Sequence, residues 1–387
     1  MADEYTYLIA LLRCALRGTA AMEKPENLSW KSIYALAAKH GVTVLAYSAV
    51  DASALASDAA VFDLWSESCA KIITKRVNQE HELVRLAALF AKEELPYMPL
   101  KGSCIKDLYP AMEYRDMTDL DILIPANESA RAHALMLREG YSPIATTSHN
   151  TEYIKRPYLV VELHTNLVPR ECEYFPYYEE PWKRARKTDA PFCHDLSNED
   201  LYIYQLAHTA KHYYGCGTGL RSVMDVYVFL TKHRSALDES YLAREFDKLG
   251  LRGFRETIEE LAFYWFSQRT GALSDDGAEM AHYIRSSSTY GSQGGRDENY
   301  VRRHMRKGKS ARAAKFSFYM TIVFPGRKEL AYTYAALHKA PILLPFFWVV
   351  RGVRVLVSKP RSIVKQYRRT KKIRTYEEIK MDISGKK

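Results

Sequence analysis

The sequence predicts an α+β fold: a small mixed β-sheet wrapped by helices, with a helical N-terminal layer and a helical C-terminal region. Apolar residues recur at helical spacing over residues 5–77 and again over 197–268. Between them, short apolar runs bounded by glycine or polar residues alternate with helical segments, which is the pattern of strands joined by helices. The 387 residues are 47% hydrophobic, which is enough for a sizeable core and excludes a wholly disordered chain.

The N-terminal layer, residues 1–80, is predicted to consist of amphipathic helices. Asn27 or Ser29 is placed to cap the second helix, because both residue types accept hydrogen bonds from free backbone N–H groups. Gly41 is placed to end it, because glycine tolerates the left-handed backbone that follows many helices. The helical spacing of apolar residues covers the segments 5–16, 30–40, 42–50 and 61–77.

Residues 81–195 are predicted to form an α/β core. Helices are expected at 81–94, from Gly102 onward, and at 127–139, where Gly140 follows as a C-terminal cap. The runs that predict strands are short and rich in apolar residues. These strands are expected at 97–100, 119–124, 141–145 and 158–164.

The rest of the chain divides into three predicted segments. Residues 196–270 form a helical subdomain, which Ser197 and Asp200 open with a helix-start pattern. Residues 271–300, rich in serine and glycine, form a polar linker, and residues 301–387 form a basic C-terminal segment. Helices are expected from residue 201, over 221–233, 240–249 and 254–266, and within the linker over 279–284.

Charge is distributed unevenly along the chain. The formal net charge is +10, from 56 Lys and Arg against 46 Asp and Glu. Residues 301–387 hold 23 of the basic residues and only four of the acids, so residues 1–300 are net acidic. We therefore expect any electrostatic partner to bind the C-terminal segment.

Cysteine spacing and hydropathy indicate a cytoplasmic protein. The six cysteines lie far apart without a C-x-x-C pair, which favours free thiols over a disulfide framework or a zinc site. Acidic Asp3 and Glu4 follow the first residues, where a signal peptide would be basic. The longest uncharged apolar run, 340–350, has 11 residues, whereas a membrane-spanning helix needs about 20. No transmembrane span is expected.

The most informative stretch places two carboxylates on one strand. Asp119 and Asp121 are two residues apart, so on a strand they face the same side, while Leu120 and Ile122 face the core. Paired carboxylates suit Mg²⁺, which takes oxygen ligands and completes its shell with water and phosphate oxygens. A third acid is expected from a neighbouring strand, and Glu162 interrupts an apolar one.

A Lys101-Gly102-Ser103 turn precedes the acidic strand and opens a helix. Its free backbone N–H groups and the helix dipole favour a phosphate tail, and Gly102 permits close backbone approach. Ser103 would equally serve as an ordinary helix cap, and Lys101 as a strand end. Arg115 either contacts the triphosphate or forms a salt bridge to a nearby aspartate.

This order of motifs resembles a known enzyme core, the nucleotidyltransferase core of the DNA polymerase β-like superfamily. The shared features are a Gly-Ser turn, an Asp-x-Asp strand and one later strand acid. More narrowly, residues 30–235 resemble the bacterial family of uncharacterised nucleotidyltransferases. The superfamily's third acid is commonly Asp, whereas Glu162 is one methylene longer. The narrower resemblance is carried by the run Lys101–Ile124, Gly140-Tyr141, Glu162-Leu163-His164 and Leu220–Asp225.

The resemblance implies metal-dependent transfer of a nucleoside monophosphate from a nucleoside triphosphate such as ATP to an acceptor hydroxyl, with release of pyrophosphate. Two Mg²⁺ ions are expected, and Asp119 and Asp121 would hold the one on the triphosphate. Glu162 would complete the second metal site or take the proton of the acceptor. The expected nucleotide-binding residues are Lys101, Gly102, Ser103 and Arg115.

Three histidines are candidates for the same cleft. His164 is two residues from Glu162 and faces the same side of its strand. His208 and His212 stand four apart on one helix face, a spacing that metal sites use, but zinc is not favoured without an obvious third ligand. A hydrogen-bonded structural role is the alternative, and a hydrolase built on these two histidines is a weaker hypothesis.

The basic segment permits three interpretations: a solvated or packed charged surface, an anionic membrane surface, and nucleic acid. Residues 346–357 combine aromatic and aliphatic residues with arginines, which would suit a membrane surface, and the alternation within residues 353–357 fits a strand as well as a helix. The residues expected to contact nucleic acid are Arg302, Arg303, Arg306, Lys307, Lys309, Arg368, Arg369, Lys371, Lys372 and Arg374.

The favoured function is Mg²⁺-dependent nucleotidyl transfer to an unidentified small molecule, sugar, RNA or protein hydroxyl. A template-dependent polymerase is not favoured, because no nucleic-acid-binding module is recognisable. The alternative is a non-catalytic nucleotide-binding or scaffold protein that docks on an anionic membrane or polyanion through its basic segment. In both cases the expected location is the cytoplasm, with peripheral contact to the inner face of the membrane as an open alternative.

Overall fold

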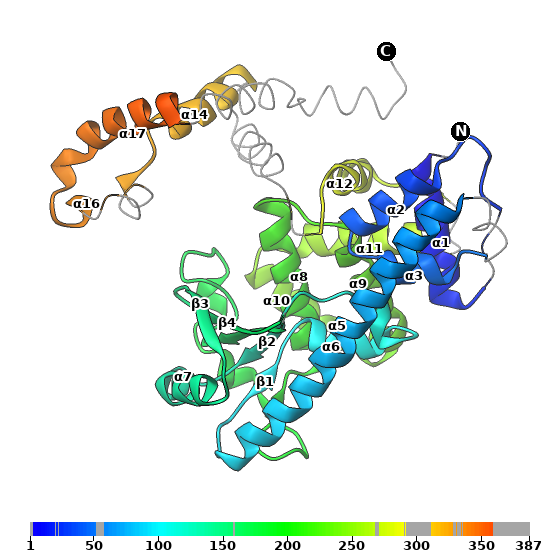
Figure 1. Cartoon of the computed structure of the whole chain (residues 1–387), viewed down its shortest axis with the longest axis horizontal. Coiled ribbons are helices and arrows are strands. Elements are labelled where there is room, and N and C mark those ends of the chain that lie inside the picture. Colours follow the sequence, from blue (N-terminus) through cyan, green and yellow to red (C-terminus); the bar gives the residue numbers. More distant parts are fainter. Residues whose placement is uncertain are drawn as a thin grey trace. The chain divides into compact units, whose positions relative to one another are not determined.

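The computed structural model describes residues 3–19, 21, 23–51, 58–157, 159–267, 271–289, 291, 311–327, 330, 334 and 336–358. They belong to two compact units, one of Met1–Lys211 with Thr218–Thr289 and the other of His212–Gly217 with Tyr290–Lys387. The first unit combines helices with a mixed sheet, so the predicted α+β class is confirmed (Figure 1). The division into five sequence segments stays a prediction.

The first three helices form where the sequence predicts them. They are α1 (Glu4–Arg17), α2 (Trp30–Lys39) and α3 (Thr43–Ser48). Asp3 caps α1 by accepting a hydrogen bond from a backbone N–H of the first turn, and Gly18 ends it with a φ of 64°. Of the two residues predicted to cap α2, Ser29 does so.

Helix α5 (Ala59–Lys92) is one continuous helix of 34 residues. The sequence predicts two helices here, 61–77 and 81–94, and that prediction is wrong. The intervening residues contain neither proline nor glycine, so nothing in them ends a helix. The polar side chains that interrupt the apolar pattern are buried, because Arg76 Nη1 donates to Gln79 Oε1 at 3.0 Å inside the unit.

Five strands form one mixed sheet in the order β1-β2-β5-β4-β3. Strands β2 and β5 run parallel, and the other neighbours run antiparallel. The four predicted strands are present, but the sequence does not predict β4, whose residues are mostly polar. The bounds are β1 (Met98–Pro99), β2 (Leu120–Leu123), β3 (Ser142–Thr146), β4 (Asn150–Lys155) and β5 (Leu159–His164), with a separate two-stranded ribbon of β6 (Arg186–Lys187) and β7 (His194–Asp195).

One face of the sheet packs against α5 and against α7 (Ser129–Arg138) (Figure 1). Leu120 and Ile122 of β2 join Phe90 of α5 and Met136 of α7 in this core. Burying each such side chain contributes about 1.5–3 kcal/mol to the free energy of unfolding. Because side chains alternate along a strand, Asp121 lies on the opposite face of the sheet.

Helices cover the remainder of the first unit. The predicted start of α8 is confirmed, because Asp200 N–H donates to Ser197 Oγ at 3.0 Å. Tyr202 of α8 stacks on Phe229 of α9, with ring centroids 5.1 Å apart. The helices are α6 (Gly102–Ile105), α8 (Asn198–Tyr214), α9 (Leu220–His233), α10 (Glu239–Lys248), α11 (Arg252–Phe266) and α12 (Asp275–Ser286). The 3₁₀ turns are η2 (Lys106–Leu108), η3 (Met112–Tyr114), η4 (Ala126–Glu128), η5 (Phe175–Tyr177), η6 (Pro181–Arg184) and η7 (Arg234–Ala236).

The second unit contains α14 (Ala311–Val323), α16 (Ala336–Lys339), the turn η8 (Pro341–Leu343) and α17 (Leu344–Ser358). Of the two conformations that the sequence left open for residues 346–357, the structure has the helix. Trp348 Nε1 and Arg351 Nη1 of α17 donate to Pro325 O and Ile322 O, at 2.9 and 2.8 Å. The ten basic residues expected to contact nucleic acid lie outside the described residues.

Candidate active site

Asp121 and Glu162 lie side by side on parallel strands. In the register of β2 and β5, Asp121 is opposite Glu162, and Leu123 is opposite His164. The neighbouring positions Leu120 and Ile122 are buried in the core, so the two acids share the other face of the sheet. The structure thus brings the later strand acid next to the Asp-x-Asp pair.

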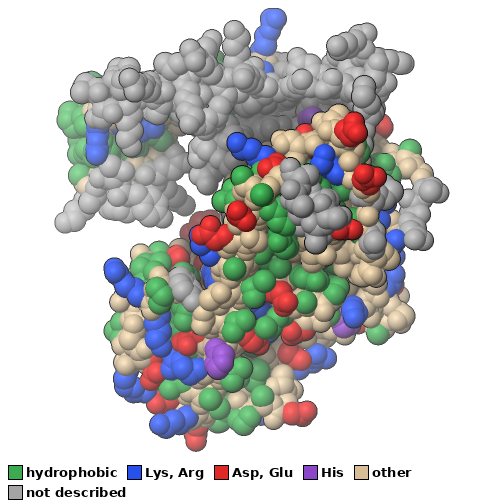
Figure 2. All heavy atoms as spheres, turned by 45° about the vertical axis from the view of Figure 1, so that its right-hand side comes forward, with side chains coloured by type: hydrophobic (Ala, Val, Ile, Leu, Met, Phe, Trp, Pro, Cys, Tyr) green, Lys and Arg blue, Asp and Glu red, His purple; other side chains and the backbone are tan. Residues whose placement is uncertain are grey.

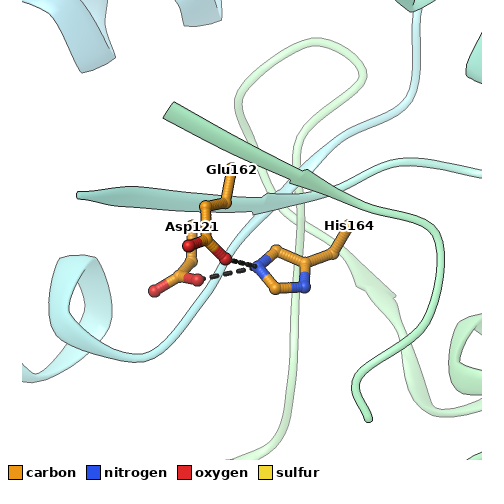
Figure 3. Close-up of side chains that lie close together, drawn as sticks. All are labelled: Asp121, Glu162 and His164. Carbon is orange, nitrogen blue, oxygen red and sulfur yellow. Dashed lines mark hydrogen bonds and ion pairs between the residues drawn. The ribbon is translucent and has the colours of Figure 1, made fainter. Parts of the chain in front are cut away.

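His164 joins the two acids. Its Nε2 lies 2.7 Å from Asp121 Oδ1 and 3.2 Å from Glu162 Oε2 (Figure 3). Ionised carboxylates only accept hydrogen bonds, so Nε2 carries a proton. The ring is buried, and its Nδ1 has no hydrogen-bond partner in the part of the chain that the structure describes. Figure 3 shows both carboxylates turned toward the same ring nitrogen.

Each of the two carboxylates has one engaged oxygen. Lys101 Nζ lies 2.7 Å from Asp121 Oδ1, the oxygen that also meets His164. Asn150 Nδ2 donates to Glu162 Oε2 at 2.7 Å. From the described residues, no hydrogen bond or ion pair reaches Asp121 Oδ2 or Glu162 Oε1. One oxygen of each acid is therefore open to a ligand.

Negative charge is crowded at this face. Asp119, which directly precedes β2, is half-buried, and its burial together with Asp121 and Glu162 raises its pKa to about 6 despite Lys101. Burial opposes ionisation of Asp121 as well, but Lys101 and His164 outweigh it and hold the pKa of that carboxyl well below its usual range. The two aspartates therefore differ in proton affinity although they share one strand. A cation beside them would relieve the repulsion.

The Lys101-Gly102-Ser103 turn lies against the same strand. Leu100 N–H donates to Asp121 O at 2.9 Å, which ties the turn to β2. Lys101 has a φ of 48°, an uncommon conformation for a residue with a side chain, and such strain costs about 1–3 kcal/mol. Burial opposes the charge of Lys101, but Asp121 outweighs it and raises the pKa of the ammonium group. Ser103 Oγ is buried and receives or donates no hydrogen bond among the residues that the structure describes.

Arg115 is paired with a residue far away in sequence. Its Nε and Nη2 donate to the two carboxylate oxygens of Asp225 on α9, both at 2.8 Å. Tyr109 OH donates to the same carboxylate at 2.7 Å. A Cβ at Gly102 would collide with Arg115 Nη1 and would lie 2.8 Å from Met117 Sδ, so a larger residue would have to displace these two side chains. The nucleotide contact of Arg115 stays a prediction.

Helix α8 contributes a stripe that the sequence showed only in part. Tyr204, His208 and Lys211 follow one another at spacings of four and three residues, which places them on one face. The rings of Tyr204 and His208 are 6.1 Å apart. Burial, together with the charge of Lys101, lowers the pKa of Lys211, and the charges of Asp121 and Glu162 offset only part of that shift. In the sequence, the three-residue spacing between His208 and Lys211 would have placed Lys211 on the same helix face.

His212, the other histidine predicted on this helix, belongs to the second unit. Its carbonyl oxygen accepts hydrogen bonds from Gly215 and Gly217 N–H at 3.1 and 2.8 Å. These two bonds close the C-terminal end of α8. A cleft role for His208 and for His212 stays a prediction.

Strand β4 adds His149 and Asn150 at its beginning, and the sequence analysis missed both. The ring of His149 is 5.6 Å from that of His164. Burial, with His164 and Lys211, lowers the pKa of His149 to about 4. The signal was weak, because β4 has no run of apolar residues that would place its polar side chains in a sheet.

The donor set fits a divalent cation. Asp121, Glu162 and His164 each offer a ligand atom, and these atoms lie within 4.8 Å of one another; His164 would bind a cation through Nε2 only after that nitrogen gives up its proton. Within the described part of the chain, this group contains His164 where the sequence predicts Asp119. Carboxylate oxygens suit Mg²⁺ and Mn²⁺, and an imidazole nitrogen suits Mn²⁺ and later transition metals.

The chain resembles a nucleotidyltransferase family in sequence and solved structures in fold. A family model described as an uncharacterised nucleotidyltransferase matches residues 26–267. No curated protein matches the sequence. Among solved structures, a solution structure of the antibiotic-resistance factor ANT(2'')-Ia matches at 13% identity and a TM-score of 0.33, covering 48% of this chain and 96% of that one. A crystal structure of ANT(2'')-Ia in complex with adenylyl-2''-tobramycin matches at 12% identity and a TM-score of 0.24, covering 48% and 97%.

Proposed function

We propose the following reaction for this chain, which belongs to the family of uncharacterised nucleotidyltransferases and is a nucleotidyltransferase enzyme. It transfers a nucleoside monophosphate from a nucleoside triphosphate, with ATP as the first candidate, to an acceptor hydroxyl and releases pyrophosphate. The observation that supports this most is the pair of open oxygens, Asp121 Oδ2 and Glu162 Oε1, on one face of the sheet beside the Lys101-Gly102-Ser103 turn.

The acidic residues are proposed to hold divalent metal, with two Mg²⁺ ions as the expected complement. The candidate ligands are Asp119, Asp121 and Glu162, with His164 beside them. The fit rests on the open carboxylate oxygens and on the crowding of acids, since burial and the charges of Asp121 and Glu162 raise the pKa of Asp119 to about 6. When bound, the ions would neutralise the charge that develops on the phosphates.

The turn is proposed to bind the phosphate tail. Ser103 supplies a buried hydroxyl that has no hydrogen-bond partner among the described residues, so a phosphate oxygen would satisfy it. Gly102 has no side chain, and a side chain there would meet Arg115, so the backbone of the turn is left accessible to a phosphate. Lys101 holds its ammonium group against Asp121, where it balances one of the negative charges before substrate binds.

Glu162 has two candidate roles, which its surroundings permit equally. Asn150 and His164 hold Oε2 and thereby orient the side chain, so Oε1 is free to accept the proton of the acceptor hydroxyl or to bind metal. Glu162→Gln distinguishes them. Loss of the base lowers kcat with the metal dependence unchanged, whereas loss of a ligand raises the Mg²⁺ concentration needed for half-maximal rate.

The proposal is tested by incubating the full chain with Mg²⁺, α-labelled nucleoside triphosphates and a cell extract that supplies acceptors. We expect a labelled acceptor, and we expect Asp121→Asn and Asp119→Asn to lower the rate by roughly 10³-fold or more, because fixed charge stabilisation is lost. EDTA should abolish labelling and added Mg²⁺ should restore it.

The matched control is Asp63→Asn, which removes an exposed carboxylate on α5. Equal labelling by wild type and by Asp121→Asn would rule out the catalytic assignment. Thermal stabilisation by nucleotide without any turnover would favour the non-catalytic nucleotide-binding alternative.

A further inference from the structure

Helix α17 of the second unit is apolar on two opposite faces. One face packs inward, where Phe347 and Trp348 join a small core around Leu337. The other face is exposed to solvent, although an ordinary surface helix presents polar residues there. The exposed apolar residues stand four, three and four positions apart, as a helical stripe requires, and are between 57% and 88% exposed. This α17 stripe consists of Phe346, Val349 and Val353 of α17 together with Ile342 of the preceding turn η8.

Helix α14 repeats the pattern. Ala314 and Phe318 are buried, four residues apart on one face. Phe316, Met320 and Val323 are exposed, at spacings of four and three residues, on the face opposite to Ala314. Two neighbouring helices in sequence thus each show a continuous apolar stripe to solvent, which a monomeric soluble protein rarely does.

The charges beside these stripes are of one sign. The described residues of the second unit include no aspartate and no glutamate. Residues 359–387 add 11 Lys and Arg against three acids in the sequence. In Figure 2, apolar and cationic side chains lie side by side at the upper left, where this unit is drawn. The basic side chains near the two helices are Arg312, Lys315, Arg327, Arg351 and Arg354.

We propose that α14 and α17 dock on an anionic lipid bilayer, with the apolar stripes at the boundary of the acyl chains and the basic side chains among the headgroups. Amphipathic helices with aromatic and aliphatic residues next to Lys and Arg bind bilayers in this way. The contact lies on the surface: at about 1.5 Å per residue, the 15 residues of α17 are too short for a hydrocarbon core of about 30 Å. Among the described helices, none is long and apolar enough to cross a membrane.

The alternatives fit these observations less well. A second copy of the chain would bring two cationic surfaces together, because its α14 and α17 carry the same positive charges. Nucleic acid would satisfy the positive charge but would leave the aliphatic residues Ile342, Val349 and Val353 exposed, since nucleic-acid sites use basic and aromatic side chains. An anionic bilayer satisfies both features. The proposal is independent of the transfer reaction, because none of these residues belongs to the acidic cluster.

The test is co-sedimentation of the full chain with sucrose-loaded vesicles, either of pure phosphatidylcholine or with 30 mol% phosphatidylglycerol. We expect binding to the anionic vesicles at least tenfold stronger than to the neutral ones, with the difference lost at high salt. Phe346→Gln/Val349→Gln/Val353→Gln should weaken binding to anionic vesicles at least tenfold. Arg354→Gln should weaken it about fivefold.

The matched control is Leu64→Gln/Val84→Gln, which removes exposed apolar residues from α5 of the first unit and should leave vesicle binding unchanged. Circular dichroism and the unfolding temperature verify that each variant is folded. The proposal is overturned if the triple variant binds anionic vesicles like wild type, or if neutral vesicles bind equally well. It is also overturned if wild type does not bind anionic vesicles while the α17 stripe mediates dimerisation or binding of a single-stranded RNA oligonucleotide.

Discussion

Arg115 illustrates how a single residue's role depends on its partner. Its spacing before the Asp-x-Asp strand suggested a phosphate contact or a local ion pair. In the structure, both Nε and Nη2 are taken up by Asp225, about a hundred residues later, inside the unit. Arg115 Nη1 of this pair lies against Gly102, so the pair supports the Lys101-Gly102-Ser103 turn whether or not it contacts a nucleotide.

The buried pair therefore predicts a stability effect. Arg115→Met should lower the free energy of unfolding by about 3–5 kcal/mol, because it leaves Asp225 buried without its countercharge. Adding Asp225→Leu should restore part of that loss. Urea denaturation of wild type, both single variants and the double variant measures the coupling.

The control for this cycle is Lys71→Met, which breaks an exposed ion pair to Glu67 and should not change the free energy of unfolding measurably. If Arg115→Met keeps its stability and loses only nucleotide affinity, the side chain serves the triphosphate instead.

At the scale of elements, the register between β2 and β5 decides whether the site exists. A slip of one residue would turn Glu162 into the core and Val161 or Leu163 toward the acids, because side chains alternate. The core residues Val161 and Leu163 of β5 prevent the slip, since it would move them out of the core. Chemistry and packing are thus determined by the same alternation.

Helix α5 supports the packed face of the sheet, and its continuity predicts a second stability effect. Val77→Pro should lower the free energy of unfolding by about 3 kcal/mol or more, because proline removes a hydrogen bond and clashes with the preceding turn. Thermal unfolding followed by circular dichroism measures the change.

Val77→Ala is the matched control, since Val77 is exposed and alanine favours a helix. Equal stability of the two variants would mean that the chain breaks near residue 77, as the two-helix pattern of the sequence indicates.

At the scale of the first unit, His40 joins three helices. It follows α2, its Nδ1 accepts Leu220 N–H at the start of α9 at 3.2 Å, and its ring is 5.4 Å from that of Tyr5 on α1. Burial, together with Lys39, lowers the pKa of His40 to about 3. The folded protein therefore holds this histidine neutral at pH values where the unfolded chain binds a proton.

This shift predicts a pH dependence of stability. Between about pH 3 and the unfolded value near 6.5, the unfolded state binds more protons, so stability rises with pH and is lost as pH falls. His40 contributes at most about 1.4 kcal/mol per pH unit in that window. His40→Asn should flatten the slope of unfolding free energy against pH, measured by urea denaturation from pH 4.5 to 7.5. His81→Asn, at an exposed position on α5, should not, and parallel slopes for wild type and His40→Asn would contradict the assignment.

How far the sequence reaches is clear from particular residues. The caps at Ser29 and Ser197, the strand that begins directly after Asp119 and carries Asp121, and the family were predicted correctly, because each depends on neighbours in sequence. The helix break near residue 78 was predicted wrongly, because burial of Arg76 and Gln79 overrides the local pattern. Strand β4 was missed, because its polar residues carry no hydrophobic periodicity.

The sequence by itself determined the fold class, the enzyme family and the Gly-Ser turn with its paired acids, since these depend on spacings of a few residues. Only the tertiary structure decided which residues meet: His164 between Asp121 and Glu162, Asp225 with Arg115, and Asn150 with Glu162. The physical reason is that sheet register and helix packing bring together side chains separated by up to about a hundred residues. Local periodicity does not encode which distant residues come into contact, because these contacts depend on how the whole core packs.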